Sequence, residues 1–306
     1  MDIKQKASLF AIVSAAILAI GKFSVGLISG SMAVTSSGLD SLLDVFMSGM
    51  NFFAIKKAAK PADHEHQYGH AKSEDLAAII QSLVIVFSGA AIIYTSIDKF
   101  LNKGMITYSR LDIGVMVSSL VFTIAVSTVL KVVGKKTGSK ALMADALHYM
   151  SDLYSNSAAI IAIIITYYTG KTYFDLLFAV IIGFIIIFSA IKIFRDGLSG
   201  LMDTSIPEKT EKEIENIIDA MPFPYAGYHK FRSRLAGNKK YLDFHLLICR
   251  KALVEEAHNL ADVIEVKITE KMQDIDVTIH IEPCPNNCEL TAETCVVLKM
   301  RIQKST

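Results

Sequence analysis

Four ionisable residues in apolar stretches have the types and the spacing of metal ligands. Asp40 and Asp44 lie four residues apart in one stretch, and His148 and Asp152 lie four apart in another. Residues four apart on an α-helix share a face, so each pair would point the same way. Two such helices packed together would present three carboxylates and one imidazole, which suits a tetrahedral divalent ion such as Zn²⁺.

The alternative interpretation of these four residues is a buried, hydrogen-bonded polar cluster that holds helices together. An acid inside a membrane span costs about 2.5–3.5 kcal/mol on insertion scales, so it usually marks a pathway or a site. Two paired sets in different stretches favour the metal site. Asp145 precedes His148 by three residues. It could orient the imidazole as an outer partner, or lie at the water boundary near Lys140, and we favour the second position.

A short polar loop between apolar stretches carries a second candidate metal site. Asp63, His66 and His70 supply one acid and two imidazoles within eight residues. A loop with that content can hold one divalent ion. The alternative is a solvated polar loop without a ligand, and the sequence favours metal binding only slightly over it.

Half of the eight histidines lie in the last third of the chain. Strand alternation around Phe244 places His245 on a polar face, and alternation around Ile279 places His280 and Glu282 on a polar face as well. His229 could join them from an adjacent strand, whereas His258 lies on a predicted helix. These five residues predict cytoplasmic metal sites; the alternative is a set of surface histidines.

The thiols of the C-terminal part give a weaker signal. Cys284 and Cys288 form an isolated C-x3-C, followed by Cys295. Two thiolates would suit Zn²⁺ or Cu(I). In a reducing compartment we expect unligated thiols instead.

Six charge-poor runs are long enough to position the acids inside a membrane, where a helical span needs about 20 apolar residues. Two of the six runs carry the paired ligands, and we expect the last run to extend a few residues each way as a helix. The predicted spans are Leu9–Ile28, Ser31–Ile55, Leu76–Ile97, Ile113–Leu130, Ala141–Thr169 and Leu176–Ile191. We therefore expect an all-α six-helix membrane domain over residues 1–200.

The Lys and Arg residues that flank these spans set the predicted orientation. Twelve of them lie in the N-terminal segment, the second and fourth connections and the segment after the last span, and four lie on the other side. The excess of positive charge marks the cytoplasmic side. Both termini are therefore predicted to be cytoplasmic.

Residues 201–290 read as a small α+β domain, with a C-terminal tail at 291–306. Gly237 and Asn238 form a turn signal between two runs of strand-like alternation. The order α-β-β-α-β suits a sheet with helices on one face. The predicted elements are Glu208–Ala220, His229–Leu235, Tyr241–Arg250, Ala252–Met272 and Asp276–Glu282.

Composition excludes several classes of protein. The chain has 306 residues, of which 52% are hydrophobic, and about half of its charged residues lie in the last third. It is too apolar at the front for a soluble enzyme and too charged at the back to lie wholly in a membrane. The net charge of +1 argues against nucleic-acid binding. There is no Gly-rich phosphate loop, so ATP is not expected to drive it.

Four stretches together resemble the cation diffusion facilitators, of the bacterial zinc and iron efflux type, over nearly the whole chain. Two of them contain the paired ligands, one is the His-containing loop and one links the spans to the C-terminal domain. They are Leu39-Asp40-Ser-Leu-Leu-Asp44, Pro61-Ala-Asp63…His66…Tyr-Gly-His70, His148-Tyr-Met-Ser-Asp152 and Leu201-Met202-Asp203.

The resemblance implies a homodimeric divalent-metal/proton antiporter with six spans per protomer and a ferredoxin-like, metallochaperone-like cytoplasmic domain. It carries over the transport site as Asp40, Asp44, His148 and Asp152, the loop site as Asp63, His66 and His70, and the cytoplasmic sites as His229, His245, His258, His280 and Glu282. Similar members often have Asp where this chain has Glu282, and the Cys-rich end also departs from the family.

The expected function is export of Zn²⁺ from the cytoplasm across the inner or plasma membrane, with Cd²⁺, Fe²⁺ and Co²⁺ as further candidate substrates. Zn²⁺ would also be a regulatory ligand, and no organic cofactor is expected. One alternative is a membrane-anchored metal sensor or scaffold, and another is a transporter mainly of Fe²⁺ or Mn²⁺. An embedded metalloenzyme ranks last, because no acid or base remains beyond the four ligands.

Overall fold

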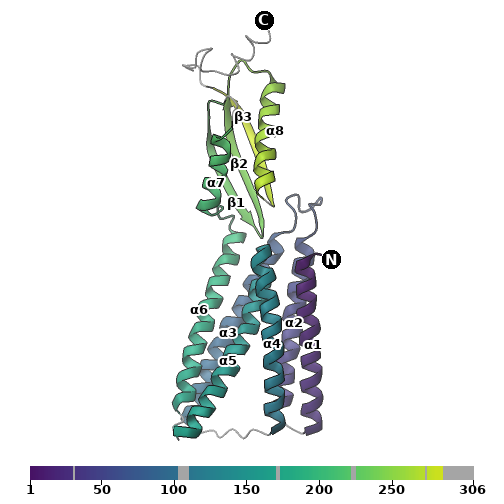
Figure 1. Cartoon of the computed structure of the whole chain (residues 1–306), viewed down its shortest axis with the longest axis vertical. Helices are drawn as coiled ribbons and strands as arrows, with labels where there is room; N and C mark the ends of the chain where they lie inside the picture. The colour runs from purple at the N-terminus through teal and green to yellow at the C-terminus, as the bar shows by residue number, and fades with distance from the viewer. Residues whose placement is uncertain (30–31, 103–109, 170–172, 222–224, 273, 285–306) are drawn as a thin grey trace. The chain divides into compact units, whose positions relative to one another are not determined.

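The computed structural model describes the chain apart from residues 30–31, 103–109, 170–172, 222–224, 273 and 285–306 (Figure 1). It divides into two compact units, Met1–Leu201 and Met202–Thr306. The predicted tail at 291–306, with Cys295, and the predicted partner thiol Cys288 lie outside the described residues.

Long helices that run side by side make up the first unit (Figure 1). Each predicted span lies within one of them, apart from Ser31, which lies outside the described residues. The helices of the described part are α1 (Ile3–Ser29), α2 (Met32–Ala58), α3 (Lys72–Asn102), α4 (Arg110–Thr137), α5 (Lys140–Thr169) and α6 (Tyr173–Leu201).

The helices extend beyond the apolar runs that predicted them. The helix α3 begins four residues before Leu76, with Glu74 and Asp75 in its first turn, where the positive end of the helix dipole favours acids. The helix α6 continues from Ile191 to Leu201. Hydrophobicity marks the part of a helix that suits lipid, whereas backbone hydrogen bonds continue through charged turns, so each helix is longer than the predicted span within it.

Four of these helices are long and apolar enough to cross a membrane: Ile3–Ile28, Lys72–Asp98, Ser118–Thr137 and Leu176–Leu201. They belong to α1, α3, α4 and α6. The paired candidate ligands lie on two other long helices of the described part, α2 and α5.

Packing places α5 against α2, α3, α4 and α6, and α1 against α2 and α4. The helices α3 and α6 approach closely where Gly89 meets Gly183, since a Cβ added at Gly183 would lie 3.1 Å from the Gly89 carbonyl oxygen. Small residues permit such approach between membrane helices. The helix α5 thus has neighbours on several sides, and side chains on it are well placed for an internal site.

Two buried ion pairs tie helix ends together in the first unit. Glu74 lies 2.8 Å from Lys4 Nζ and accepts a hydrogen bond from Ser139. Asp75 lies 2.7 Å from Lys140 Nζ. These pairs link the beginnings of α1, α3 and α5. The partner of Lys140 is therefore Asp75 of α3, and not Asp145 of its own helix.

The second unit contains α7 (Glu208–Asp219), β1 (Gly227–Ala236), β2 (Lys239–Ile248), α8 (Val254–Lys271) and β3 (Ile275–Pro283). The strand order is β1-β2-β3, with β1 antiparallel and β3 parallel to β2. Gly237, at φ 60°, and Asn238 form the predicted turn. The β2 strand ends at Ile248, two residues before the prediction, because the Cys249 carbonyl accepts the turn hydrogen bond from Ala252. The element order is the α-β-β-α-β order that the sequence predicted.

The two faces of this sheet differ in character. Alternate residues of β2, including Leu242, Phe244 and Leu246, are buried against Ile214 of α7 and Ile264 of α8. The opposite face carries the intervening polar residues of the strands. The second unit therefore has its own hydrophobic core on one face and leaves the other face for polar chemistry.

Candidate metal centre

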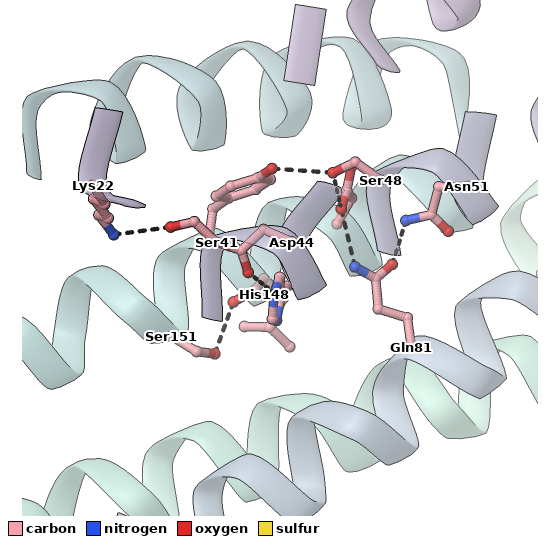
Figure 2. A network of polar contacts seen from close by, with 11 residues as sticks. Lys22, Ser41, Asp44, Ser48, Asn51, Gln81, His148 and Ser151 are labelled. Carbon is pink, nitrogen blue, oxygen red and sulfur yellow. Dashed lines mark hydrogen bonds and ion pairs between the residues drawn. The ribbon is translucent and has the colours of Figure 1, made fainter. Parts of the chain in front are cut away.

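The centre of the first unit brings together ligands from α2 and α5. His148 Nε2 lies 2.9 Å from Asp44 Oδ1 (Figure 2). Asp152 lies one turn further along α5. One ligand atom from each of the three lies within 4.8 Å of the others. Ligand atoms around a tetrahedral Zn²⁺ are separated by roughly 3.3 Å. Small side-chain movements would therefore allow all three to hold one ion.

Asp40, the fourth predicted ligand, lies outside this group. It is one turn before Asp44 on α2, and it is exposed. Four residues advance an α-helix by a little more than one turn, so Asp40 is rotated by about 40° from Asp44. Lys22 of α1 reaches this part of α2, where its ammonium donates to Ser41 Oγ at 3.0 Å (Figure 2).

The loop between α2 and α3 groups all three of its predicted ligands. Asp63 Oδ2 lies 3.2 Å from His70 Nε2, and Asp63 Oδ1 lies 3.4 Å from His66 Nδ1. The His66 backbone N–H donates to Asp63 at 2.7 Å, which is the main cause of the lowered pKa of this carboxyl. His66 and His70 lower the pKa of Asp63 further. The carboxylate is thus held ionised, the form that binds metal.

The polar face of the C-terminal sheet aligns three of the predicted histidines. His229 is paired with His245 across β1 and β2, and His245 with His280 across β2 and β3. Glu282 accepts hydrogen bonds from His229 Nε2 at 2.8 Å and from His245 Nδ1 at 2.7 Å. These two bonds lower the pKa of Glu282 to about 2. His229, His245 and Glu282 form a group with ligand atoms within 4.8 Å of one another.

Two of the predicted C-terminal ligands lie outside that group. His280 Nε2 is 3.9 Å from Glu282 Oε1, and its ring lies 4.6 Å from the ring of His245. His258 is exposed on α8, where it lies 3.6 Å from Asp262. Because α8 packs on the apolar face of the sheet, His258 is separated within one chain from the histidines on the polar face.

Asp145 does not lie at the water boundary that the sequence favoured. Its exposed fraction is 0%, and it accepts hydrogen bonds from Ser48 and Gln81. The expectation failed because Lys140 pairs with Asp75, leaving Asp145 one turn deeper on α5. Ser48, Asn51 and Gln81 were not predicted as parts of this network. The amide side chains of Asn51 and Gln81 inside apolar runs are a sequence signal for buried polar contacts.

Comparison with known proteins decides the family. The family model described as "Cation efflux transmembrane domain" matches residues 8–202, and "Cation efflux protein, cytoplasmic domain" matches residues 206–284. The chain belongs to the cation efflux family. This confirms the predicted resemblance to the cation diffusion facilitators. The protein is a cation efflux transporter of the membrane rather than an enzyme, with a helical transmembrane region and a cytoplasmic α+β domain.

Relatives of this cation efflux protein match it along most of its length. Cation-efflux pump FieF of Salmonella typhi is 34% identical over 280 residues, which cover 92% of this chain and 93% of the relative. FieF of Salmonella choleraesuis (strain SC-B67) has the same identity and coverage. Among solved structures, the metal-bound C-terminal domain of the CzcD transporter from Thermotoga maritima is 29% identical, covering 26% of this chain and 92% of that one, with a TM-score of 0.25.

Proposed function

We propose that this transporter exports Zn²⁺ from the cytoplasm in exchange for protons, through a site formed by Asp44, His148 and Asp152. The observation that carries the proposal is the approach of His148 to Asp44 across the α2–α5 interface, with Asp152 within ligand distance. Asp40 is the fourth ligand in this proposal. Alternating access in this proposal comes from rigid-body rocking of helices around the fixed site.

The donor set favours particular ions. One imidazole nitrogen among carboxylate oxygens suits Zn²⁺ and also Cd²⁺, while Fe²⁺ and Co²⁺ accept mixed nitrogen and oxygen ligands. Mn²⁺ prefers sites made wholly of oxygen. Zn²⁺ is therefore the proposed main substrate.

Proton coupling follows from ligand chemistry. A carboxylate or an imidazole must lose its proton before it binds metal, so protons and Zn²⁺ compete for the same atoms. The site loads Zn²⁺ when it faces the cytoplasm, and protons displace the ion when it faces a more acidic exterior. Each pH unit across the membrane contributes about 1.4 kcal/mol per proton.

The proposed assembly is a homodimer in the inner or plasma membrane, with six spans per protomer and both termini in the cytoplasm. The distribution of Lys and Arg supports this orientation. The loop group at Asp63, His66 and His70 and the sheet group at His229, His245 and Glu282 are proposed regulatory Zn²⁺ sites. Both are chemically competent, because each offers imidazole and ionised carboxylate.

Reconstitution of the full chain tests the proposal. Proteoliposomes with an imposed pH gradient should accumulate Zn²⁺ while protons move in the opposite direction, and a protonophore should abolish the gradient-driven part. A metal sensor or scaffold would bind Zn²⁺ without moving it. Zn²⁺ binding with no uptake and no proton flux would therefore contradict the transport proposal and favour the sensor.

A further inference from the structure

A buried polar network lies one helical turn from the proposed transport site, on the same two helices. Ser48 follows Asp44 by one turn of α2, and Asp145 precedes His148 by nearly one turn of α5. The Ser48 hydroxyl lies 3.2 Å from both carboxylate oxygens of Asp145. A second hydrogen-bonded contact, between Ser48 and Asp145, therefore joins α2 to α5 one turn from the Asp44–His148 contact.

The network also reaches α3. Gln81 Nε2 donates to Asp145 Oδ1 at 3.0 Å, and Asn51 Nδ2 of α2 donates to Gln81 Oε1 at 2.5 Å (Figure 2). Ser48, Asn51, Gln81 and Asp145 are each 0% exposed. One fully buried carboxylate therefore connects α2, α3 and α5.

The directions of these hydrogen bonds identify Asp145 as the hub. Ser48 has one hydroxyl proton, which it donates to Asp145, so the Tyr149 hydroxyl 3.0 Å away must donate to Ser48. On the other side Asn51 donates to Gln81, which donates to Asp145. Both arms end on the carboxylate, and an asparagine at position 145 would leave one accepting oxygen and put an NH2 donor where the second oxygen accepts.

Simple packing does not require such a hub. The same helices already share a buried apolar cluster that includes Leu142 and Ala146 of α5 and Ala77 of α3. Among the described residues no Lys or Arg forms an ion pair with Asp145. A buried carboxylate without a cation costs stability, and apolar replacements of buried polar groups are often neutral or stabilising. What directional bonds add is a fixed rotation and spacing of the helices, which apolar contacts do not specify.

We propose that Asp145 is a positioning residue of the transport site. With Ser48 and Gln81 it fixes α5 against α2 and α3, so that His148 and Asp44 stay at ligand distance. This inference rests on the proposed function, because the residues that it positions are the proposed ligands. Its effect is on metal affinity, since a ligand set held at the correct spacing binds without reorganising the helices.

The decisive variants are Ser48→Ala and Asp145→Asn, with Ser151→Ala as the matched control. Ser151 is also buried, but its hydroxyl donates to the Leu147 carbonyl of its own helix (Figure 2). In Zn²⁺ uptake by the reconstituted full chain, Ser48→Ala and Asp145→Asn should raise the KM by about fivefold to tenfold, the effect of one lost hydrogen bond. The maximal rate should change less, and Ser151→Ala should stay within about twofold of the wild type.

Two further measurements separate positioning from general stabilisation. Thermal unfolding without Zn²⁺ shows that each variant is folded; if Asp145→Asn is not, Ser48→Ala decides. The double variant Ser48→Ala/Asp145→Asn should be no worse in KM than Asp145→Asn alone, because both remove the same contact. A lower melting temperature with an unchanged KM would overturn the proposal, as would a KM for both single variants equal to that of Ser151→Ala.

Asp44→Ala, measured in parallel, separates this proposal from the one on which it rests. If Asp44→Ala abolishes uptake while Ser48→Ala and Asp145→Asn behave like the Ser151→Ala control, the transport site stands and the positioning role is wrong. If Asp44→Ala retains wild-type uptake, the transport site itself is wrong, and the positioning role is overturned with it.

Discussion

At the scale of single residues, His148 supplies the one nitrogen donor of the ligand group between α2 and α5. Its position 2.9 Å from Asp44 makes it the residue through which the two helices would share an ion in the proposed site. Nitrogen ligands favour Zn²⁺ over Mn²⁺, whereas carboxylate oxygens suit both. The identity of this one side chain should therefore set the preference between the two metals.

We predict that His148→Asp shifts transport toward Mn²⁺. The site becomes all-oxygen and more negative, so the ratio of Zn²⁺ to Mn²⁺ uptake should fall by about tenfold, equivalent to about 1.4 kcal/mol of differential binding. Competition uptake in proteoliposomes measures this ratio. The matched control is His258→Asp, the same change at an exposed position outside the group. An equal ratio in the two variants would show that His148 does not contact the ion.

Tyr225 gives a pH-dependent prediction for the C-terminal unit. Burial, together with the hydrogen bond that its hydroxyl donates to Asp219 at 3.0 Å, raises the pKa of Tyr225 to about 12. A raised pKa in the folded state gives stability that is present below the unfolded pKa of about 10 and lost as the pH rises toward 12. The wild type should lose stability across that window, and Tyr225→Phe should lose less. Thermal melts across the window check this, and parallel losses in both proteins would refute it.

At the scale of elements, close approach of α3 and α6 depends on the absence of side chains. A Cβ at Gly183 would lie 2.5 Å from Ile93 Cγ1 and 3.1 Å from the Gly89 carbonyl oxygen. Ile93 can move, but the Gly89 backbone cannot move without shifting α3. The contact between these helices is therefore sensitive to one methyl group.

We predict that Gly183→Ala destabilises the membrane unit by about 1–3 kcal/mol, the usual cost of overpacking. Thermal unfolding of the purified protein in detergent measures the change. Gly21→Ala is the control, because no heavy atom lies within 4 Å of a Cβ at Gly21, and alanine favours a helix over glycine. Melting temperatures for Gly183→Ala at or above those for Gly21→Ala would contradict the proposed contact.

Local sequence patterns predicted the helices and strands better than the side-chain contacts between them. Charge-poor runs located the long helices, and strand alternation placed His245 and His280 on one face, as the pairing of β2 with β3 confirms. The helices continue beyond the predicted spans because charged turns remain helical. These features depend on neighbours in the chain, which the sequence shows directly.

The contacts of Asp145 and Asp40 could not be predicted from local sequence patterns. The partners of Asp145 are Ser48 and Gln81, which are far from it in sequence and come from two other helices. Asp40 shares a predicted face with Asp44 but lies outside the ligand group. Both outcomes depend on the rotation of each helix within the bundle, and hydrophobic periodicity determines that rotation only coarsely.

At the scale of the whole molecule, the C-terminal unit has its own core and its own ligand group. We predict that a fragment of residues 202–306 folds alone. Zn²⁺ at one hundred times its Kd should raise the free energy of unfolding of this fragment by about 2.7 kcal/mol, and its melting temperature should rise with it. His245→Ala should remove most of this gain, and His258→Ala should retain it. Differential scanning calorimetry tests both; equal gains in the two variants would exclude the sheet group as the binding site.

The central claim is that Zn²⁺ crosses the membrane through the ligands shared by α2 and α5. Zn²⁺ uptake under a fixed pH gradient, in Asp44→Ala and Asp152→Ala, tests it most directly. The control is Asp196→Ala, the same change at an exposed position of α6. Losing one ligand leaves an incomplete site, so both ligand variants should lose uptake and its coupled proton flux, while the control transports normally. Wild-type uptake by either folded ligand variant would contradict the account.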